Sequence, residues 1–528
     1  MRSFLMTLAL CVSLPVLAEQ SLVVCSEASP EGFDIVQYTA ATTADASAET
    51  LFERLVQFAP GSTRLVPALA ERWQISDDGL RYTFELRRGV RFHETPWFKP
   101  SRDFNADDVL WSFERQREQH HPWHALSPRG FPYFEAMGFA ELIDKVEKLD
   151  DYRVRFTLKH PEAPFLADLA MGFTSIYSSE YAAQLLKAGT PGKLNSQPIG
   201  TGPFVFERYA KDAQIRFRAN PTYWAGKPAL DKLLLAITPD PNTRLQQLKA
   251  GACQIALHPR PTDIADLRQE PKLKVLELDS LLTAYVALNT RHKPLDDVRV
   301  RQAINLAFDR QAYLRAQYGE GNASLAVAPY PATLPGFDQG LQPWPLDQAR
   351  ARQLLAEAGH AQGLKLSIWT RPGGGPTNPN PGIGAQMLQA DLAAIGIYSD
   401  IRVFEWGELI KRAKNGEHDL VFMGWAGDNG DPDNFLTPNL SCAAAASGEN
   451  QAGWCNKDFD QLIREARRVT EPDRRAALYR EALLIFHEQA PWIALAHPKQ
   501  FAVLSKDVEG FVLNPMGSNN FSQVRRMK

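Results

Sequence analysis

Hydrophobic and polar residues alternate in short segments along the chain, and the period switches between that of a strand and that of a helix. The segment from Leu80 to Phe92 alternates residue by residue, which predicts a half-buried strand pair that bends at Gly89. The segment from Asn105 to Glu118 opens with an asparagine and two acidic residues, and apolar residues then recur at helical spacing. It predicts a helix with Asn105 as its N-cap.

Helix-like and strand-like patterns alternate between residues 350 and 425, approximately. A helical pattern that ends at Gly359 is followed by the apolar run 364–370, and the same order then repeats. This order predicts βαβ units with a mainly parallel sheet, and hence an α/β fold. Two irregular segments, 373–384 and 423–435, each follow a predicted strand. Because ligands of open α/β sheets bind beyond the carboxyl ends of the strands, we expect both segments to line one cleft.

The segment from Met423 to Phe435 combines clustered acid with turn residues. It reads MGWAGDNGDPDNF and contains three aspartates, two asparagines and a tryptophan among glycines and a proline. Such a composition is typical of a stiff turn. Three functional interpretations compete: a metal loop, a catalytic pair of carboxylates, and a socket for a cationic ligand. A structural interpretation, in which Asp428 only caps its own turn, is equally compatible with the residues alone.

Metal and catalytic motifs receive little support from the sequence. The calcium-loop template fails, because Asn434 stands where glycine is required and Leu440 where the bidentate glutamate belongs. His120, His121 and His124 lie close together without a nearby cysteine or acid, so we expect an exposed loop and no zinc site. No nucleophile elbow, HExxH motif or Walker loop occurs. We therefore expect no catalytic residue, no bound metal and no cofactor.

Composition excludes some partners and indicates the compartment. The chain has 528 residues and a formal net charge of −3, which offers no basic field for nucleic acid. Its length corresponds to roughly two to four domains. Residues 1–18 consist of an early arginine, an apolar run and a small-residue site, which predicts a signal peptide that is cleaved after Ala18. We therefore expect an exported protein, located in the periplasm of a Gram-negative cell.

Four cysteines remain once the predicted signal peptide is removed: Cys25, Cys253, Cys442 and Cys455. An even number in an oxidising compartment favours disulfides. Cys442 and Cys455 enclose a short loop, and closing it contributes about 3 kcal/mol in the chain-entropy model. We therefore pair these two and, by elimination, pair Cys25 with Cys253. The alternative is four buried thiols.

Several motifs spread over the chain carry a family resemblance. Four of them are LAERWQISDDGLRYTFELRRGVRFHE, FNADDVLWSFER, PIGTGPF and PLDDVRVRQAINLAFDR. They resemble the peptide/nickel family of ABC-transporter substrate-binding proteins. CSEASPEGFD, HPEAPFLADLAM, EWGELIKRAKNGEH and MGWAGDNGDPDNF are similar to its dipeptide-binding members in particular. The resemblance covers the whole mature chain, and the four cysteines match the two disulfides of those members.

The resemblance implies an α/β fold of the two-lobed periplasmic-binding-protein type, class II with an extra subdomain and two hinge crossovers. One discontinuous lobe is expected to comprise residues 19–280 plus 498–528 and to include the extra subdomain. The other lobe is expected to comprise residues 281–497. Closure of the lobes on a ligand and docking on an inner-membrane ABC permease are implied as well, and we expect a monomer.

The resemblance also implies a binding site between the lobes. Asp428 is expected to pair with the α-ammonium of a peptide ligand, since a desolvated ion without a partner costs several kcal/mol. A carboxylate that is fixed on a rigid turn before binding lowers the cost of reorganisation. The ligand main chain is expected to bind in the strand-addition mode, which ignores side-chain identity. The other residues expected at the site are Trp425, Gly424, Trp406, Thr42, Thr43 and Tyr133.

One position departs from the family pattern. The dipeptide-binding members meet the terminal carboxylate with an arginine, and a gapless match places Gly375 at that position. Arginine suits the role because its planar fork binds carboxylate through two hydrogen bonds. Arg371, four residues earlier, is the candidate replacement. Otherwise the ligand is extended or modified beyond its second residue, as in longer peptides or peptide conjugates.

Other functions stay open at this point. Haem or a peptide-like metal chelate is the leading alternative ligand, since some relatives in the family bind such groups. An exported peptidase that uses Asp428 and Asp431 as paired carboxylates is the alternative from another class. A periplasmic chaperone is a third.

Overall fold

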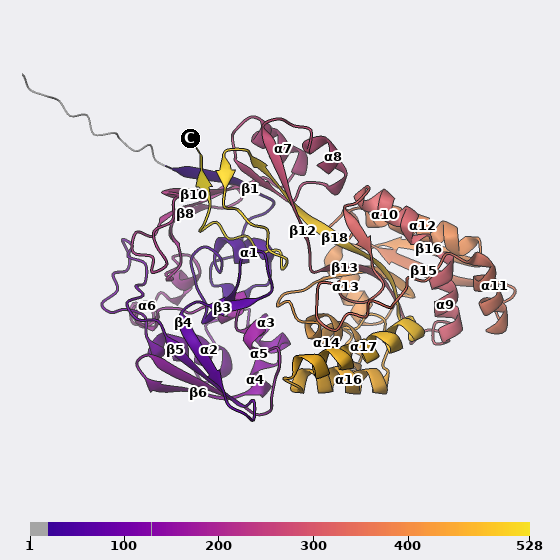
Figure 1. The fold of residues 1–528 in the computed structure, drawn as a ribbon, viewed down its shortest axis with the longest axis horizontal. Helices are drawn as coiled ribbons and strands as arrows, with labels where there is room; N and C mark the ends of the chain where they lie inside the picture. Colours follow the sequence, from indigo (N-terminus) through magenta and orange to yellow (C-terminus); the bar gives the residue numbers. More distant parts are fainter. Residues whose placement is uncertain (1–19, 128, 528) are drawn as a thin grey trace, which may run out of the picture.

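One long strand, β18 (Trp492–Ser505), runs through both lobes of the molecule (Figure 1). Its first part pairs antiparallel with β13 (Leu282–Leu288), and its last part pairs antiparallel with β11 (Ile255–Leu257) and β12 (Leu273–Asp279). The short step from β12 to β13 is a second link between the lobes. These pairings merge the strands of both lobes into one twelve-stranded sheet.

The computed structural model describes residues 20–127 and 129–527. The expected signal peptide, 1–18, lies outside the described residues. The expected lobe boundaries stay predictions; 280/281 falls at the β12–β13 step, and 497/498 falls within β18. Within the described ranges, no helix combines the length and apolar character that crossing a membrane requires.

The N-terminal lobe contains one half of the large sheet, in the order β11-β1-β10-β9-β8, with β12 paired to β18. Parallel pairing of β1 with β10 and β11 places the N-terminal strand inside this half. The remaining elements of this half are β1 (Ser21–Ser26), β8 (Phe204–Ala210), β9 (Gln214–Ala219), β10 (Lys232–Ile237), α7 (Pro241–Lys249), η4 (Pro261–Asp263) and α8 (Ile264–Leu267).

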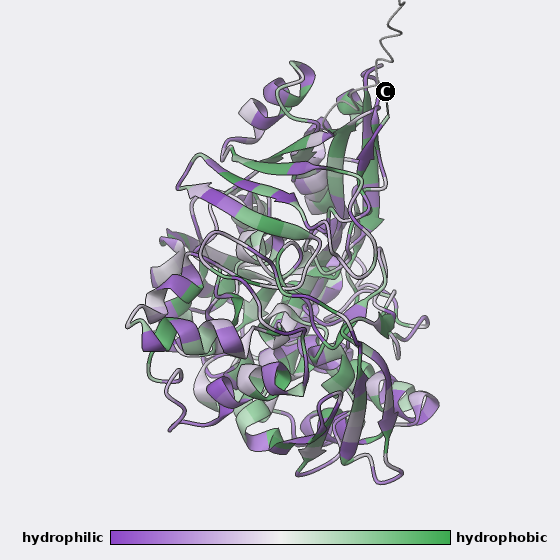
Figure 2. Cartoon of the chain, turned by 90° about the vertical axis from the view of Figure 1, so that its left-hand side faces the viewer, coloured by the Kyte–Doolittle hydropathy of each residue, from purple (hydrophilic) through white to green (hydrophobic). Residues whose placement is uncertain are grey.

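A separate four-stranded antiparallel sheet, in the order β4-β5-β7-β6, forms a subdomain within the N-terminal lobe. Two of its strands, β5 and β7, alternate buried with less buried residues, and Figure 2 shows green and purple bands along strands in the lower part of the molecule. Its elements, with the adjoining ones, are η1 (Ile35–Gln37), α1 (Ala41–Ala46), β2 (Val56–Phe58), β3 (Leu65–Pro67), β4 (Ala70–Ile75), β5 (Arg81–Leu86), α2 (Ala106–Arg117), α3 (Pro132–Ala136), α4 (Phe139–Leu142), β6 (Ile143–Asp150), β7 (Arg153–Leu158), α5 (Phe165–Asp168), η2 (Gly172–Thr174), α6 (Ser179–Lys187) and η3 (Pro191–Asn195). The short strands β19 (Val508–Glu509) and β20 (Arg525–Arg526) pair with each other beside β1 and β12.

The C-terminal lobe holds the other half of the sheet, in the order β16-β15-β17-β13, with β14 paired to β18. β15 is parallel to both β16 and β17, so the predicted βαβ order is confirmed. Helices cover both faces, which is why β13 is buried along its whole length. Its remaining elements are α9 (Val298–Ala307), α10 (Arg310–Tyr318), β14 (Ala323–Leu325), α11 (Gln348–Glu357), β15 (Leu364–Thr370), α12 (Pro381–Ala393), β16 (Ile397–Val403), α13 (Trp406–Lys414), β17 (Leu420–Ala426), α14 (Asp433–Leu440), α15 (Cys442–Ser447), α16 (Lys457–Arg468) and α17 (Pro472–Gln489).

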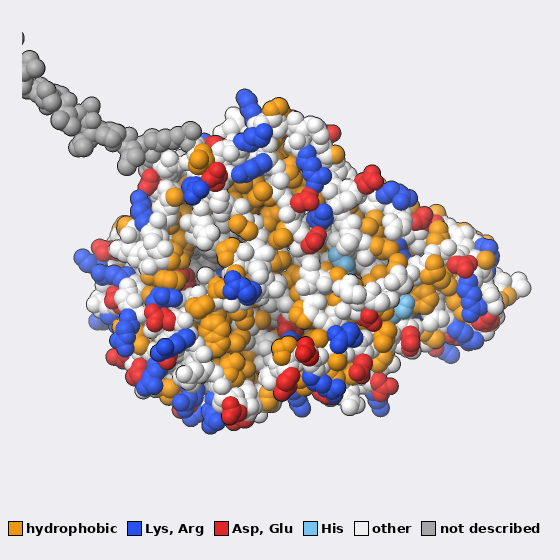
Figure 3. Space-filling view, in the orientation of Figure 1, with side chains coloured by type: hydrophobic (Ala, Val, Ile, Leu, Met, Phe, Trp, Pro, Cys, Tyr) orange, Lys and Arg blue, Asp and Glu red, His pale blue; other side chains and the backbone are white. Residues whose placement is uncertain are grey.

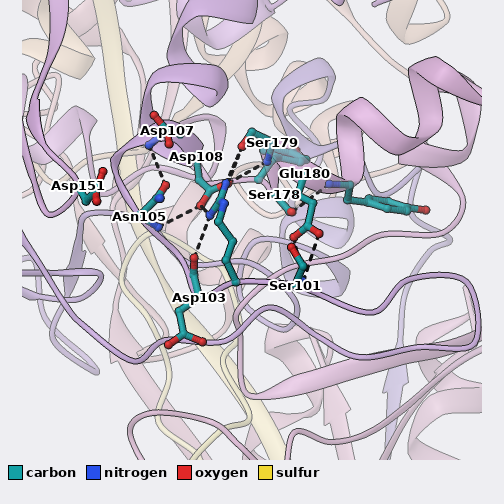
Figure 4. A network of polar contacts seen from close by, with 12 residues as sticks. Ser101, Asp103, Asn105, Asp107, Asp108, Asp151, Ser178, Ser179 and Glu180 are labelled. Carbon is teal, nitrogen blue, oxygen red and sulfur yellow. Dashed lines mark hydrogen bonds and ion pairs between the residues drawn. The ribbon is translucent and has the colours of Figure 1, made fainter.

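Local signals explain where helix α2 begins. Asn105 accepts a hydrogen bond from the Asp107 N–H at 2.9 Å, and the Asp108 carboxylate accepts one from the Asn105 N–H at 3.0 Å. Asp108 also accepts hydrogen bonds from the backbone and hydroxyl of Ser179 at the start of α6, so one acid fixes two helix starts (Figure 4). The predicted Asn105 cap is confirmed.

The predicted strand pair over residues 80–92 is only half right. β5 forms over Arg81–Leu86, but the chain turns out of the sheet at Gly89, whose φ is +70°. After the turn, the Val90 carbonyl and the His93 N–H pair with loop residues and not with a strand. Burial of the apolar residues under these loops produces the alternation without a second strand.

Both predicted disulfides are present. Cys25 joins Cys253, which ties β1 to the loop before β11, and Cys442 joins Cys455 across a separation of 13 residues. The interpretation as four free thiols was therefore wrong.

Candidate ligand-binding site

A cavity of about 860 Å³ lies where the lobes meet; the N-terminal lobe forms most of its lining, and the C-terminal lobe contributes Trp425, Ala426 and Asp428. Figure 3 shows hydrophobic side chains gathered toward the middle of the face in view, while Lys and Arg intermingle with Asp and Glu over the rest. The volume lies within the range of pockets that enclose small organic ligands. The lining residues that matter below are Tyr38, Tyr133 and Phe173 from the N-terminal lobe, and Trp425 and Asp428 from the C-terminal lobe.

Asp428 lies just beyond the carboxyl end of β17 and is half-buried at the cavity. Burial raises the pKa of its carboxyl from 3.8 to about 6, although hydrogen bonds from Tyr133 and Asn434 oppose that shift. Within the described ranges, no lysine or arginine forms an ion pair with it. An acid that faces a cavity without a countercharge is suited to meet a cationic ligand group.

Asn434 is a residue of this site that was not among the predicted binding residues; in the sequence it only marked the place where a calcium loop would need glycine. Its side-chain oxygen accepts hydrogen bonds from the Asp428 N–H at 3.0 Å and from the Trp425 indole N–H at 3.3 Å. One buried amide therefore fixes both the acid and the aromatic wall. The signal for it was the turn composition, since Asn and Asp side chains commonly hydrogen-bond to nearby backbone.

Tyr133 reaches the acid from the other lobe. It lies on α3, and its hydroxyl donates to Asp428 Oδ1 at 2.9 Å. Burial, with the nearby Asp428 charge, raises the pKa of Tyr133 well above its ordinary value, so the phenol stays protonated and able to donate. Its ring stacks on Phe173 with centroids 6.0 Å apart. The structure thus brings together Tyr133, Trp425 and Asp428 of the predicted set.

The N-terminal wall of the cavity is fixed by Asn195. Its side-chain oxygen accepts hydrogen bonds from the backbone N–H groups of Phe33 at 2.8 Å and Asp34 at 2.9 Å. Its amide also donates to the Tyr38 hydroxyl at 2.8 Å, and Tyr38 lines the cavity. This long-range contact is a second feature that the sequence alone did not reveal.

Thr42 and Thr43 lie beside the cavity but do not line it. Helix α1 begins at Ala41, so successive side chains point in different directions and residues three apart share a face. Ala41 and Ala44 take the face toward the cavity. Thr43 is buried, and its hydroxyl accepts the Glu31 N–H at 3.0 Å. The roles of both threonines stay predictions.

Arg371 and Trp406 follow the carboxyl ends of β15 and β16, on the same sheet edge as Asp428. The Arg371 guanidinium lies 4.6 Å from the centre of the Trp406 ring, and Trp406 is 44% exposed. Both residues lie outside the lining of the cavity. Within the described ranges Arg371 has no acidic partner, and burial lowers the pKa of its guanidinium. It is therefore a cation without a countercharge at the cleft edge.

Gly375 and Gly424 permit close packing of the loop after β15. A Cβ at Gly375 would collide with Nη2 of Arg371, so the absent side chain makes room for that guanidinium. A Cβ at Gly424 would collide with the Thr377 side chain, which packs on β17. Asn378 anchors the loop by donating to the Met423 carbonyl at 2.8 Å. The binding roles predicted for both glycines stay predictions.

The remaining aspartates of the acidic turn have other partners. Asp431 binds Arg475 through both carboxylate oxygens, at 2.6 and 2.8 Å, and is buried. Asp431 thus has an arginine as its partner while Asp428 has Tyr133, so the two carboxylates make different contacts, and the paired-carboxylate interpretation gains no support from them. In the part of the chain that the structure describes, no three His, Cys, Asp or Glu side chains are grouped to hold a metal ion.

The family model for bacterial extracellular solute-binding proteins, family 5 Middle, matches residues 64–447. The chain belongs to the family 5 extracellular solute-binding proteins. The resemblance drawn from the sequence motifs is therefore confirmed.

Two relatives are similar to this protein over nearly its whole length. Di/tripeptide-binding protein 4 of Pseudomonas aeruginosa (strain UCBPP-PA14) is 62% identical over 517 residues, which is 98% of this chain and 97% of that one. Heme-binding protein A of Haemophilus influenzae is 46% identical over 504 residues, 96% of this chain and 92% of that one.

Two solved structures of family 5 type share the fold. The dipeptide binding protein from Pseudoalteromonas sp. SM9913, in complex with Met-Leu, has a TM-score of 0.85 and 37% identity, covering 96% of this chain and 100% of that one. The binding protein DppA from Helicobacter pylori, in complex with peptide STSA, has a TM-score of 0.83 and 37% identity, covering 96% and 98%. The predicted two-lobed α/β binding-protein fold is confirmed.

Proposed function

We propose that this family 5 protein is the substrate-binding component of an ABC importer and that it binds dipeptides and short or modified peptides between its lobes. The observation that carries the proposal is Asp428, an acid without a countercharge that faces the interlobe cavity. The names of similar proteins support it, since one relative is called a di/tripeptide-binding protein and two similar structures hold peptides.

In this proposal the ligand ammonium pairs with Asp428, and Trp425 supplies an apolar wall that tolerates varied side chains. The ligand main chain runs along the segment 39–44, with Thr42 and Thr43 nearby. Arg371, whose guanidinium now lies beside Gly375 and against Trp406, turns toward the ligand carboxylate, and it has no acidic partner among the described residues to leave behind. The links at 280/281 and 497/498 act as the hinge.

Further parts of the proposal concern location and partners. The protein is exported to the periplasm after loss of residues 1–18, and it delivers its ligand as a monomer to an inner-membrane permease. It binds without catalysis, and its role requires no cofactor. The family name and the Asp431–Arg475 pair support a binding protein over a peptidase.

Titration calorimetry with Met-Leu and N-acetyl-Met-Leu tests the proposal. Met-Leu is expected to bind with one-to-one stoichiometry, and the acetylated peptide is expected to bind at least about 30-fold more weakly, because it brings no ammonium to Asp428. Equal affinities would contradict the role of the acid, and absence of binding to any di-, tri- or tetrapeptide would contradict the peptide assignment.

Haem or a peptide-like metal chelate is the second candidate ligand. A relative named Heme-binding protein A is 46% identical to this chain, and the cavity of about 860 Å³ lies within the range of pockets that hold small organic ligands and cofactors. Addition of haemin to the purified protein tests this candidate. A saturating shift of the Soret band that Met-Leu reverses would support a shared site, and an unchanged spectrum would exclude haem.

The pH dependence of binding is expected to report the titration of Asp428. Its pKa is raised to about 6, and the ammonium needs the charged carboxylate, so the favourable interaction is present above pH 6 and is lost as pH falls through that value. The ratio of wild-type to Asp428→Asn affinity for Met-Leu is expected to fall about tenfold from pH 7 to pH 5. Calorimetry at both pH values measures the ratio. Because titrating groups elsewhere affect the two proteins alike, their effects cancel in the ratio. A constant ratio would contradict the assignment.

Replacing Asn434 with alanine is expected to weaken Met-Leu binding by about 1–2 kcal/mol. The change removes the acceptor shared by the Asp428 N–H and the Trp425 indole N–H, which frees both to leave their binding orientation. Calorimetry measures the effect, with Asn415→Ala at an exposed position as the matched control. Equal affinities of the two variants would show that Asn434 does not organise the site.

A further inference from the structure

The lobes also touch at the opposite end of their interface from β18, where α5 lies beside α14 and α16 (Figure 1). Glu162, just before α5, accepts hydrogen bonds from Arg467 of α16, with Nη2 at 2.7 Å and Nε at 2.8 Å. The Ala163 N–H donates to the Arg467 carbonyl at 2.6 Å. A second bridge joins Asp168 to the Asn429 amide at 2.6 Å. Glu162, Asp168 and Asn429 are each at most 3% exposed.

These bridges must break when the lobes separate, because each joins a residue of the N-terminal lobe to one of the C-terminal lobe. None of these residues lines the cavity. Asn429 is the residue after Asp428, so the same turn carries the ligand acid on one side and a bridge on the other. Opening or closing of the lobes therefore acts on the turn that carries Asp428, although the bridging residues do not line the cavity.

The contact between the lobes near α5, α14 and α16 contains more carboxyl groups than guanidinium groups. Asp431 is matched by Arg475 within the C-terminal lobe. Arg467 is shared between Glu162 and Asp433, whose carboxylate lies 3.5 Å from the Arg467 Nε. Among the described residues, the hydrogen-bond partner of the Asp168 carboxylate is the neutral Asn429 amide, and no arginine or lysine forms an ion pair with it. Four carboxyl groups thus face two guanidinium groups, and a closed interface that keeps all four ionised carries two unmatched buried charges.

We infer that the Glu162–Arg467 and Asp168–Asn429 bridges form a latch that holds the lobes closed, and that its excess carboxyl groups make closure stronger as the pH falls. The inference rests on closure of the lobes around the ligand in the proposed function, but it does not depend on which ligand is bound.

The pKa values of Glu162 and Asp168 are both raised in the closed structure, which agrees with closure that becomes stronger as the pH falls. Burial raises the pKa of Glu162 from 4.5 to about 7, with Asp433 and Asp431 adding to the shift and Arg467 opposing it; His160 also lies 3.7 Å away. Burial raises the pKa of Asp168 well above its ordinary value, with Glu162 and Asp431 adding to it, while the Asn429 amide and Arg467 oppose it.

Opening exposes these groups to water, so the closed state binds more protons than the open state. The ratio of closed to open molecules therefore falls as pH rises between the ordinary carboxyl pKa and about 7, by up to about tenfold per pH unit for each proton. The Asp428 dependence has the opposite sign, and the variant ratio described above separates the two.

Small-angle X-ray scattering of the ligand-free protein from pH 5.5 to 8.5 tests the latch. The wild-type radius of gyration is expected to increase with pH. The variant Glu162→Gln/Asp168→Asn keeps the shapes and leaves each remaining acid with its own arginine, so it is expected to stay compact at every pH. Arg467→Met breaks the latch and is expected to be more open at pH 5.5 and to bind Met-Leu at least tenfold more weakly at pH 7.5.

Arg468→Met is the matched control, because Arg468 is the exposed neighbour on the same helix. Thermal unfolding monitored by circular dichroism confirms that each variant folds. A wild-type radius of gyration that does not change with pH, and that all three variants share, would overturn the latch. Absence of Met-Leu binding in every protein would instead contradict the peptide assignment, and the scattering result would still decide the latch.

Discussion

Replacing Asp428 with asparagine is expected to weaken the binding of Met-Leu by about 2–4 kcal/mol, about 30- to 1,000-fold in Kd. The substitution keeps the shape and leaves an acceptor for the Tyr133 hydroxyl and the Asn434 contact to the backbone. It removes the charge that meets the ligand ammonium in a partly desolvated cavity. Titration calorimetry at pH 7.5, above the raised pKa of Asp428, measures the loss.

Two comparisons make this result specific. Glu405→Gln removes an exposed acid from the same lobe and is expected to leave the affinity unchanged. N-acetyl-Met-Leu, which has no ammonium, is expected to bind the wild type and the Asp428→Asn variant equally. An unchanged Met-Leu affinity in Asp428→Asn would remove Asp428 from the site and favour the interpretation in which it only caps its turn.

Replacing Arg371 with alanine is expected to weaken Met-Leu binding by about 1.5–3 kcal/mol, the range for a hydrogen bond to a charged group. Arg371 is half-buried beside Gly375 and, within residues 20–127 and 129–527, has no acidic partner, so it can meet the ligand carboxylate without breaking an ion pair. Calorimetry measures the change, and Arg402→Ala, at an exposed position on β16, is the control.

A peptide without a free carboxylate separates the two explanations of the departure at Gly375. Met-Leu amide is expected to bind wild type and Arg371→Ala equally, because the amide has no terminal carboxylate with which Arg371 could pair. If Arg371→Ala binds Met-Leu as well as the wild type does, the carboxylate is met elsewhere. Tighter binding of tri- and tetrapeptides than of dipeptides by both proteins would then favour a ligand extended beyond its second residue.

Much of the fold follows from signals that lie within a few residues of one another. The Asn105 cap depends on three neighbouring residues, and the parallel order of β16, β15 and β17 depends on adjacent helix and strand patterns. The disulfide between Cys442 and Cys455 closes a short loop. In each case the energetic reason for the structure is local, so the residues alone predict it.

The site was harder to predict, because its geometry depends on side-chain direction and on contacts between distant segments. The family resemblance found the segment that holds Thr42 and Thr43, but the start of α1 at Ala41 decides that alanines face the cavity. Glu162 and Arg467 are 305 residues apart, and Tyr133 and Asp428 are 295 apart. No local pattern signals such pairs, because they form only when the lobes meet.

A crystal structure of the protein with Met-Leu bound is the most direct test of the ammonium socket. The peptide nitrogen is expected to lie about 3 Å from an Asp428 carboxylate oxygen, with Trp425 against the first side chain. A peptide held between the lobes with its ammonium on another group, or with Asp428 turned toward bulk water, would contradict it.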